Sequence, residues 1–158
     1  MENTYLVTFS ANKSDTVVKY LNQNFSDVKI DLLLDKYVTF STSKSVIPVS
    51  NNKDINNIFF IAKRFDNLTG SYFKPIFQWS GRHSLEIIGK KAKGLGYKSF
   101  RLILNDKGKI RSGYRRAIKS LENKISKETG MIVNRVSPNT EVWLTYTVEK
   151  YGFILLKI

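Results

Sequence analysis

The sequence predicts an α+β protein made of two consecutive parts. Short runs rich in β-branched and aromatic residues alternate with stretches in which apolar residues recur at helical spacing, and turn residues separate them. The net charge also changes along the chain: residues 1–70 hold 8 basic and 7 acidic side chains, whereas residues 71–158 hold 18 and 6. We therefore predict one domain over residues 1–70 and a second over residues 71–158.

The first part is expected to fold as strand, helix, strand, strand and strand. Residues 5–9 are β-branched and aromatic, which favours a strand. Asn12 or Ser14 can cap the following helix. Residues 28–34 become continuously apolar, as a buried strand does. Further elements are a helix with apolar positions Val17, Val18, Leu21 and Phe25, and strands at 37–40 and 58–62. This β-α-β-β order is half or more of a ferredoxin-like unit.

The second part begins after a connector at residues 65–75, where Asn67, Gly70 and Pro75 interrupt regular structure. We expect helix, strand, helix and three strands in a mixed sheet. The second helix carries an apolar stripe, and Gly130 closes it. That stripe consists of Tyr114, Ile118, Leu121 and Ile125. The elements are a helix at about 80–93 that ends at Gly94 and Gly96, a strand at 98–104, a turn at 105–108, a helix from about 111 to 129, and strands at 131–133, 141–148 and 151–158.

Basic residues are concentrated in residues 90–119. This stretch has eleven Lys or Arg side chains and one acid, Asp106, so it carries +10 of the formal net charge of +13. Self-repulsion among like charges destabilises a compact state, which favours a polyanionic partner, with nucleic acid as the first candidate. The basic residues are Lys90, Lys91, Lys93, Lys98, Arg101, Lys107, Lys109, Arg111, Arg115, Arg116 and Lys119.

Composition excludes several other classes of protein. The chain has no cysteine, which excludes disulfides, cysteine-ligated zinc, iron–sulfur clusters and thiol catalysis. Its apolar fraction of 42% and its 10 Phe, 8 Tyr and 2 Trp residues are typical of folded domains. There is no apolar run of about 18 residues that would predict a membrane span, and no signal peptide is visible. We expect a cytoplasmic protein without a membrane partner.

No catalytic or cofactor-binding pattern is found in the sequence. The single histidine, His83, has no partner at metal-ligand spacing and is interpreted as a packed or surface residue. Residues 89–94 have the spacing of a phosphate-binding loop, but Leu95 and Gly96 replace the required Lys and Ser/Thr. Ser99 replaces the third glycine of a dinucleotide-binding fingerprint.

The acidic residues of the second part never fall in a paired spacing suited to general acid and base catalysis. Glu122 and Glu128 are expected to be solvated residues of a helix. The sequence therefore predicts a chain without an active site, metal or cofactor of its own.

The basic residues are expected to form one positive face. On the helix that starts at about residue 111, Arg115 and Lys119 lie one turn apart, and Arg116 and Lys127 lie further round the solvent side. The helix N-terminus also suits a phosphate. The preceding turn adds Lys107, Lys109 and Arg111, and the end of the helix before it adds Lys90, Lys91 and Lys93. Nearby Tyr97, Phe100 and Tyr114 are positioned to stack on exposed bases; the alternative for Phe100 and Tyr114 is that they belong to the core.

Five segments of the second part also match a known family pattern. They are KSFRLIL at 98–104, the basic helix, TGMIVNR at 129–135, PNTEVW at 138–143 and YGF at 151–153. Together they resemble the THUMP domain, in the form found in the N-terminal region of RNA methyltransferases. The resemblance covers residues 80–158, and it extends to residues 1–65 by element order.

This resemblance implies an N-terminal ferredoxin-like unit of the NFLD type followed by a THUMP-like α/β domain. In that family the pair binds structured RNA, typically the acceptor end of tRNA, and a separate domain performs the chemistry. The methyltransferase domain, with its S-adenosylmethionine loop and Asn-Pro-Pro-type motif, is absent from this sequence. At matching positions, the implied RNA contacts are Arg101, Arg115, Arg116, Lys119 and Arg135, with Asn134 beside the last.

Two hypotheses follow. The chain is the RNA-binding part (tRNA or rRNA) of an S-adenosylmethionine-dependent RNA methyltransferase, or it is a free-standing basic RNA-binding or ribosome-associated assembly protein. A reading frame that continues past Ile158 supports the first hypothesis, and a stop codon there supports the second. DNA binding is less favoured because no helix-turn-helix or zinc spacing appears. Anionic membranes are less favoured because the apolar stripe of the basic helix is needed for the core.

Overall fold

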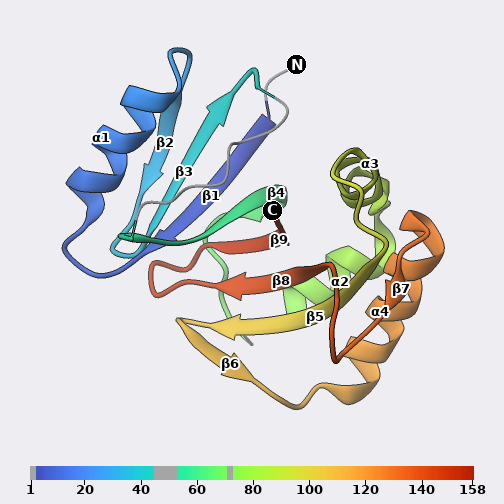
Figure 1. Cartoon of the computed structure of the whole chain (residues 1–158). Coiled ribbons are helices and arrows are strands. Elements are labelled where there is room, and N and C mark those ends of the chain that lie inside the picture. Colours follow the sequence, from blue (N-terminus) through green and yellow to red (C-terminus); the bar gives the residue numbers. More distant parts are fainter. Residues whose placement is uncertain (1–2, 45–52, 71–72) are drawn as a thin grey trace. The chain divides into compact units, whose positions relative to one another are not determined.

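Figure 1 shows the computed structural model of the chain, which describes residues 3–44, 53–70 and 73–158. The chain divides into two units, Met1–Ile61 and Ala62–Ile158. Strand β4 (Ile55–Phe65) begins in the first unit and ends in the second.

The first unit contains an antiparallel sheet and one helix. Its strands pair in the order β2-β3-β1-β4. Tyr5 of β1 lies opposite Phe40 of β3 and Phe60 of β4, and the rings of Tyr5 and Phe40 stack with centroids 5.6 Å apart. The other elements are β1 (Asn3–Phe9), α1 (Ser14–Asn24), β2 (Lys29–Leu33) and β3 (Tyr37–Thr42). This is the element order expected from the sequence.

Helix α1 turns its apolar side toward this sheet. Val17 and Leu21 are buried, and the ring of Phe25, directly after the helix, lies 6.1 Å from that of Phe40. Burial of each large apolar side chain contributes roughly 1.5–3 kcal/mol. The aromatic cluster therefore stabilises the first unit, although this unit has few residues.

Two expectations for the first unit are wrong. Neither Asn12 nor Ser14 caps α1: Asn12 has a φ of 66°, and Lys13 occupies the N-cap position without a side-chain hydrogen bond. Strand β2 is not buried on both sides, because its residues alternate between exposed and half-buried and Leu33 is 52% exposed. β2 stands at one end of the strand order, where its outer edge has no neighbouring strand among the described residues.

The second unit combines a mixed sheet with helices on its connections. Its strands pair in the order β9-β8-β5-β6, with the short β7 beside the start of β5. β5 is parallel to β7 and β8, whereas β6 and β9 are antiparallel to their neighbours. The elements are α2 (Lys74–Arg82), α3 (Glu86–Gly94), β5 (Ser99–Asp106), β6 (Lys109–Arg111), α4 (Arg115–Thr129), β7 (Ile132–Val133), β8 (Thr140–Tyr146) and β9 (Gly152–Lys157). The predicted α+β class with a mixed sheet is confirmed.

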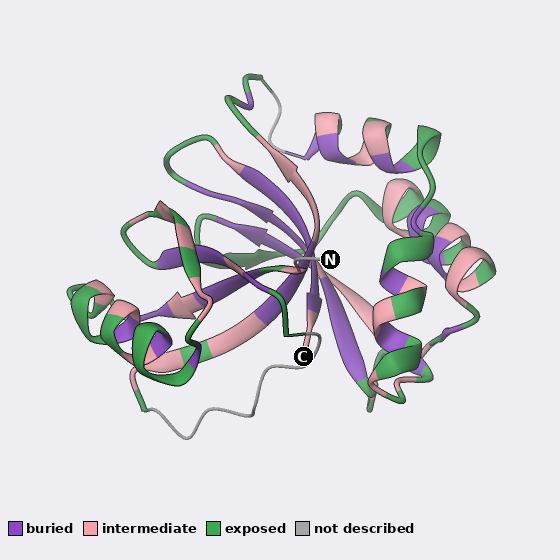
Figure 2. Ribbon diagram, turned by 90° about the horizontal axis from the view of Figure 1, so that it is seen from above, coloured by how far each residue is buried: buried purple, intermediate pink, exposed green. Residues whose placement is uncertain are grey.

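Figure 2 colours the ribbon by burial, and the buried residues of the second unit lie on its strands and on parts of its helices. Phe100 and Leu104 of β5 and Leu121 and Ile125 of α4 are buried, and α4 contacts β5. Phe100 is therefore a core residue. Gly130 ends α4 as expected: its φ is 77°, and its N–H donates to the Ser126 carbonyl over 3.0 Å.

Residues 74–94 form two helices, where the sequence predicted a connector and one helix from about residue 80. Pro75 lies in the first turn of α2, where proline is well tolerated because the missing N–H has no intrahelical partner. It therefore starts a helix and does not extend the connector. His83 is extended, with φ −122° and ψ 154°, and this break separates α2 from α3.

Residues 105–111 form a β-hairpin that the sequence analysis did not anticipate. The predicted turn is correct, with Lys107 and Gly108 at φ values of 53° and 93°, but β6 follows and pairs Asp106 with Lys109. Positive φ at both central residues is typical of two-residue hairpin turns. Because Arg111 belongs to β6, helix α4 starts at Arg115 and not at about residue 111.

Candidate nucleic-acid interface

One flank of helix α4 carries a row of basic side chains. Arg115 and Lys119 lie one turn apart on it and are exposed. Among the described residues, no ion pair or hydrogen bond engages either side chain. Glu122 follows three residues later on the same flank and accepts a 2.6 Å hydrogen bond from Nη2 of Arg135, which adds a third cation. We call Arg115, Lys119 and Arg135 the α4 row.

Arg135 is held in this row by a buried acid. The side chain of Glu122 is 4% exposed, whereas that of Arg135 is 69% exposed. The hydrogen bond and the charge of Glu122 raise the pKa of Arg135. The expectation that Glu122 is a solvated helix residue is therefore wrong. Glu128 is also engaged, since its Oε1 accepts a 3.0 Å hydrogen bond from the Leu85 N–H.

The start of α4 carries cations at the end of the helix where the dipole favours anions. Its first turn holds Arg115 and Arg116 and no acid, and the N-cap residue Tyr114 makes no side-chain capping hydrogen bond. Cations at the positive end of a helix dipole are unfavourable by about 0.3–1 kcal/mol each. An anion bound at this end would relieve that cost.

Tyr114 fixes where this helix starts. Its φ is 52°, and its ring packs against those of Phe73 and Phe77, with centroids 5.9 and 5.8 Å away. The residue is 45% exposed. Tyr114 is therefore a partly exposed residue at the edge of the core, and its ring packs against aromatic residues of the chain itself.

The hairpin contributes three of the predicted site residues, in three different environments. Lys109 is exposed. Lys107 is also exposed, and its Nζ lies 5.7 Å from the centre of the Tyr146 ring. Nε of Arg111 donates to Oδ2 of Asp106 over 3.1 Å, and the Asp106 side chain is 8% exposed.

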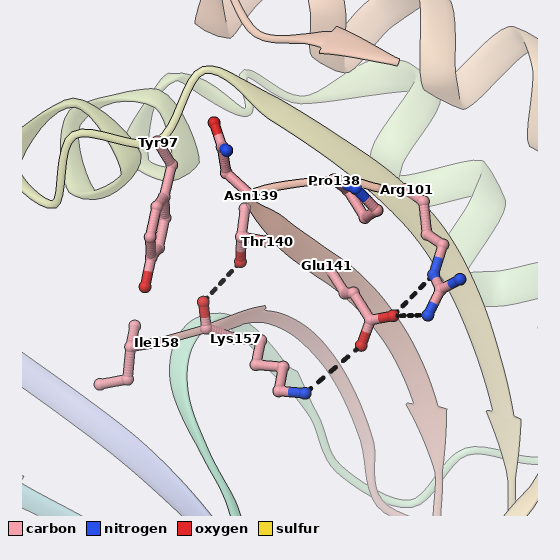
Figure 3. A pocket seen from close by; sticks show the side chains of 8 residues that line it. All are labelled: Tyr97, Arg101, Pro138, Asn139, Thr140, Glu141, Lys157 and Ile158. Atoms are coloured by element: carbon pink, nitrogen blue, oxygen red, sulfur yellow. Dashed lines mark hydrogen bonds and ion pairs between the residues drawn. The ribbon is translucent and has the colours of Figure 1, made fainter. Parts of the chain in front are cut away.

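Arg101 is engaged by a carboxylate across the sheet. It lies opposite Glu141 in the parallel pairing of β5 and β8, and its Nε donates to Oε2 of Glu141 over 2.6 Å. Nζ of Lys157 lies 3.7 Å from the other oxygen of this carboxylate, and Nε1 of Trp143 donates to that oxygen over 3.2 Å. Figure 3 shows the contacts of Glu141 with Arg101 and Lys157 at the wall of a pocket.

The same contacts set the protonation of Glu141. Burial raises the pKa of its carboxyl group, and the hydrogen bonds from Arg101 and Trp143 together with the charges of Arg101 and Lys157 outweigh burial, so the pKa lies below its ordinary value. Glu141 is therefore an anion at neutral pH, and it neutralises part of the charge around it.

The lysines of α3 lie at the other end of α4. Lys90 and Lys93 are exposed, whereas Lys91 is half-buried and burial lowers its pKa. Helix α3 crosses α4 at Gly89, where an added Cβ would stand 2.9 Å from the Cα of Thr129. Thr129 is the last residue of α4.

The expected single positive face is therefore divided along α4. The hairpin and Arg115 belong to its N-terminal end, and the α3 lysines belong to its C-terminal end. A helix of 15 residues is about 22 Å long at about 1.5 Å per residue. Among the described residues, the basic side chains are thus spread along the length of α4 and do not form one compact cluster.

Pairing with buried acids is the feature that sequence reasoning missed. Arg101, Arg111 and Arg135 each contact a carboxylate that is largely removed from solvent. Lys157, also missed, joins the Glu141 network. In the part of the chain that the structure describes, no group of His, Cys, Asp and Glu could hold a metal ion. His83 is exposed and stacks on Trp79, with ring centres 4.4 Å apart.

Comparison with known proteins places the fold. No protein-family model matches the sequence, and no curated protein matches it either. Solved structures do match. TrmN from Thermus thermophilus superposes with a TM-score of 0.60 and 12% identity over 98% of this chain and 45% of that one. A possible methylase from Clostridium difficile 630 gives 0.63 and 12% over 99% of this chain and 41% of that one.

A third similar structure is a 4-thiouridine synthetase in complex with RNA and ATP. It gives a TM-score of 0.54 with 13% identity, covering 100% of this chain and 42% of that one. The chain therefore spans less than half the length of these three proteins. At such low identity the likeness establishes the fold. No helix among the described residues is long and apolar enough to cross a membrane.

Proposed function

We propose that this chain is an RNA-binding module of the THUMP type with an N-terminal ferredoxin-like unit. Its ligand is a structured RNA, either tRNA or rRNA, and it acts in the cytoplasm. The proposal joins three features: the charge of the second unit, the fold shared with TrmN, a possible methylase and a 4-thiouridine synthetase, and the arrangement of cations along α4. One of the similar structures is a complex of a 4-thiouridine synthetase with RNA.

The start of α4 is the observation that carries the proposal. Arg115 and Arg116 stand where the helix dipole disfavours cations, and no acid of the described residues pairs with them. Phosphates supply the missing negative charge, and each phosphate contact releases counterions. Because the α4 row consists of cationic groups, we expect it to recognise backbone shape more than base edges.

We further propose that the chemistry belongs to a separate domain, which this module delivers to its RNA. Possible methylases are among the similar structures, and the chain spans less than half of their length. The sequence has no phosphate-binding loop, dinucleotide-binding fingerprint or paired carboxylate pattern. The proposed partner is an S-adenosylmethionine-dependent methyltransferase domain.

Titration with three polyanions tests the RNA assignment. The chain is titrated with unmodified tRNA, with duplex DNA of similar charge and with anionic vesicles, each over a series of salt concentrations. We expect tRNA to bind most tightly at every salt concentration, with log K falling linearly against log salt. No saturable binding of tRNA at low salt, or equal affinity for duplex DNA throughout, would overturn the proposal.

A further inference from the structure

Tyr97 stands at a fixed position between helix α3 and strand β5. Its backbone N–H donates to the Ala92 carbonyl over 2.9 Å, and Gly96 before it has a φ of 76°. On its other side, the N–H groups of Lys98 and Ser99 donate to Oδ1 of Asn139 over 2.8 and 3.2 Å. The backbone on both sides of the tyrosine is thus held by hydrogen bonds.

Tyr97 is a lining residue of two hollows. One has a volume of about 250 Å³ and is also lined by Arg101, Thr140 and Lys157. Figure 3 shows Tyr97 and Arg101 on opposite sides of this hollow. The other has a volume of about 380 Å³ and is lined by Gly96, Lys98, Met131 and Ile132, among others.

Each hollow also contains cations. Arg101 and Lys157 line the first, joined through Glu141. Lys93 and Lys98 line the second; both are exposed, and no ion pair of either side chain occurs among the described residues. Tyr97 therefore lines two hollows, each of which also has cationic side chains in its lining.

The chemistry of the tyrosine itself suits a stacking partner. Tyr97 is half-buried, and burial raises the pKa of its hydroxyl, so the ring stays neutral at physiological pH. No hydrogen bond to that hydroxyl and no contact with another aromatic ring occurs within the described residues. A tyrosine placed only for core packing would be expected to have such partners when buried.

We infer that Tyr97 is the stacking platform for one unpaired nucleotide of the bound RNA, with the flanking phosphates placed toward Lys93 and Lys98 on one side and Arg101 on the other. This inference rests on the proposed RNA-binding function and adds a ligand class to it. An unpaired base can offer its face to a side chain, whereas the bases inside a duplex are stacked on each other. The cations would bind the RNA phosphates on either side of that base.

The two parts of the interface can be tested separately. Tyr97 lies beside the C-terminal end of α4, because the larger hollow also includes Thr129 and Gly130. Arg115 lies at the opposite end of this helix, about 20 Å away at about 1.5 Å per residue. Variants at one end should leave the other end intact.

The experiment compares a blunt RNA hairpin with the same hairpin bearing a short unpaired adenosine overhang at its 5′ or 3′ end. For the wild-type chain, we expect one overhang to raise affinity by about tenfold, since a stacked base contributes about 1–3 kcal/mol. Tyr97→Leu should abolish this gain and leave blunt-hairpin affinity unchanged. Tyr97→Phe should keep it, and Lys98→Ala should reduce it.

Tyr20→Leu, in the first unit, is the matched control and should behave as wild type. Thermal unfolding establishes that each variant is folded, and the Tyr97→Phe and Lys98→Ala pair tests the inference even if Tyr97→Leu does not fold. Two results would overturn the inference but not the proposed function. One is equal affinity of the wild-type chain for the overhang and blunt hairpins, and the other is a Tyr97→Leu variant that still binds the overhang hairpin more tightly. Failure of wild type to bind any of these RNAs would overturn both the inference and the proposed function.

Discussion

The basic residues of the second unit form two groups that are indistinguishable in the sequence but differ in structure. In the open group, no ion pair engages the side chain among the described residues; it contains Lys90, Lys93, Lys109, Arg115, Arg116 and Lys119. In the paired group, a largely buried carboxylate holds each guanidinium; it contains Arg101, Arg111 and Arg135. Each side chain has the same formal charge in both groups, but the charge that it offers to a ligand is greater in the open group.

This difference assigns different work to the two groups. The carboxylate partly neutralises a paired arginine and fixes its orientation, so its loss should affect the fold first. An open cation contributes little to the fold, since surface charges rarely stabilise by more than about 1 kcal/mol. Its loss should affect RNA binding first.

The largest expected effect comes from reversing charge in the open group. Arg115→Glu combined with Arg116→Glu removes two phosphate contacts and puts acids at the start of α4, where the dipole favours them. We expect tRNA affinity at low salt to fall by about 100-fold and the slope of log K against log salt to shrink by about 2. Filter binding over a salt series measures both.

The matched control is Lys19→Glu combined with Lys36→Glu, which makes the same change in net charge in the first unit. Both lysines are exposed. We expect tRNA affinity to fall far less than with the α4 variant. The free energy of unfolding, measured with urea, should be the same for both variants as for wild type. Equal losses of affinity would mean that net charge, and not the surface at α4, determines binding.

The next effect concerns the fold and involves the paired group. Arg101→Ala removes the two contacts of its guanidinium to Glu141 and leaves this carboxylate with Trp143 and Lys157. We expect the free energy of unfolding to fall by about 1–3 kcal/mol, because a buried acceptor loses partners. Urea unfolding measures this, with Lys90→Ala as the control expected to stay within about 0.5 kcal/mol of wild type. Equal stability of both variants would contradict the distinction between the groups.

A smaller effect compares single neutralisations of equal charge. Lys119→Ala should weaken tRNA binding at low salt by about tenfold and reduce the salt slope by about 1. Arg111→Ala makes the same change in net charge but acts on a side chain already paired with Asp106, so its slope should change less. If Arg111→Ala reduces the salt slope as much as Lys119→Ala does, the ion pair with Asp106 does not prevent Arg111 from contacting RNA phosphates.

Much of the fold was predictable because its signals are local. The strand around Phe100, the Asn-Asp-Lys-Gly turn at 105–108 and the end of α4 at Gly130 each depend on a few adjacent residues. Helix α2 was missed because Pro75 was interpreted as a breaker, although proline also fits a first turn. Strand β6 was missed because its three residues are too few to show a periodic pattern.

The division of the basic residues was not predictable, since it depends on contacts between distant segments. Arg101 meets Glu141 only through the register of two parallel strands. Arg135 meets Glu122 only because the segment after β7 returns to the side of α4. The sequence correctly indicated where the charge is concentrated, but a count of charges has no information on which acid lies beside which base.

The smallest expected effect is the pH dependence of stability, which belongs to the paired group. The pKa of Glu141 is lower in the folded chain than its ordinary value of 4.5. Its contribution to stability is therefore present above about pH 4.5 and is lost as the pH falls through the folded pKa. Asp27 in the first unit acts in the same direction, because hydrogen bonds from Ser43 and Thr42 lower its pKa.

Urea unfolding at a series of acidic pH values tests this sign. We expect Glu141→Gln to lose less stability than wild type as the pH falls below about 4.5, with the loss linked to Asp27 remaining. Lys119→Ala, from the open group, should follow the wild-type pH dependence. If Glu141→Gln and wild type lose stability in parallel, the contacts around Glu141 do not favour its charged form, and the paired group owes its order to packing alone.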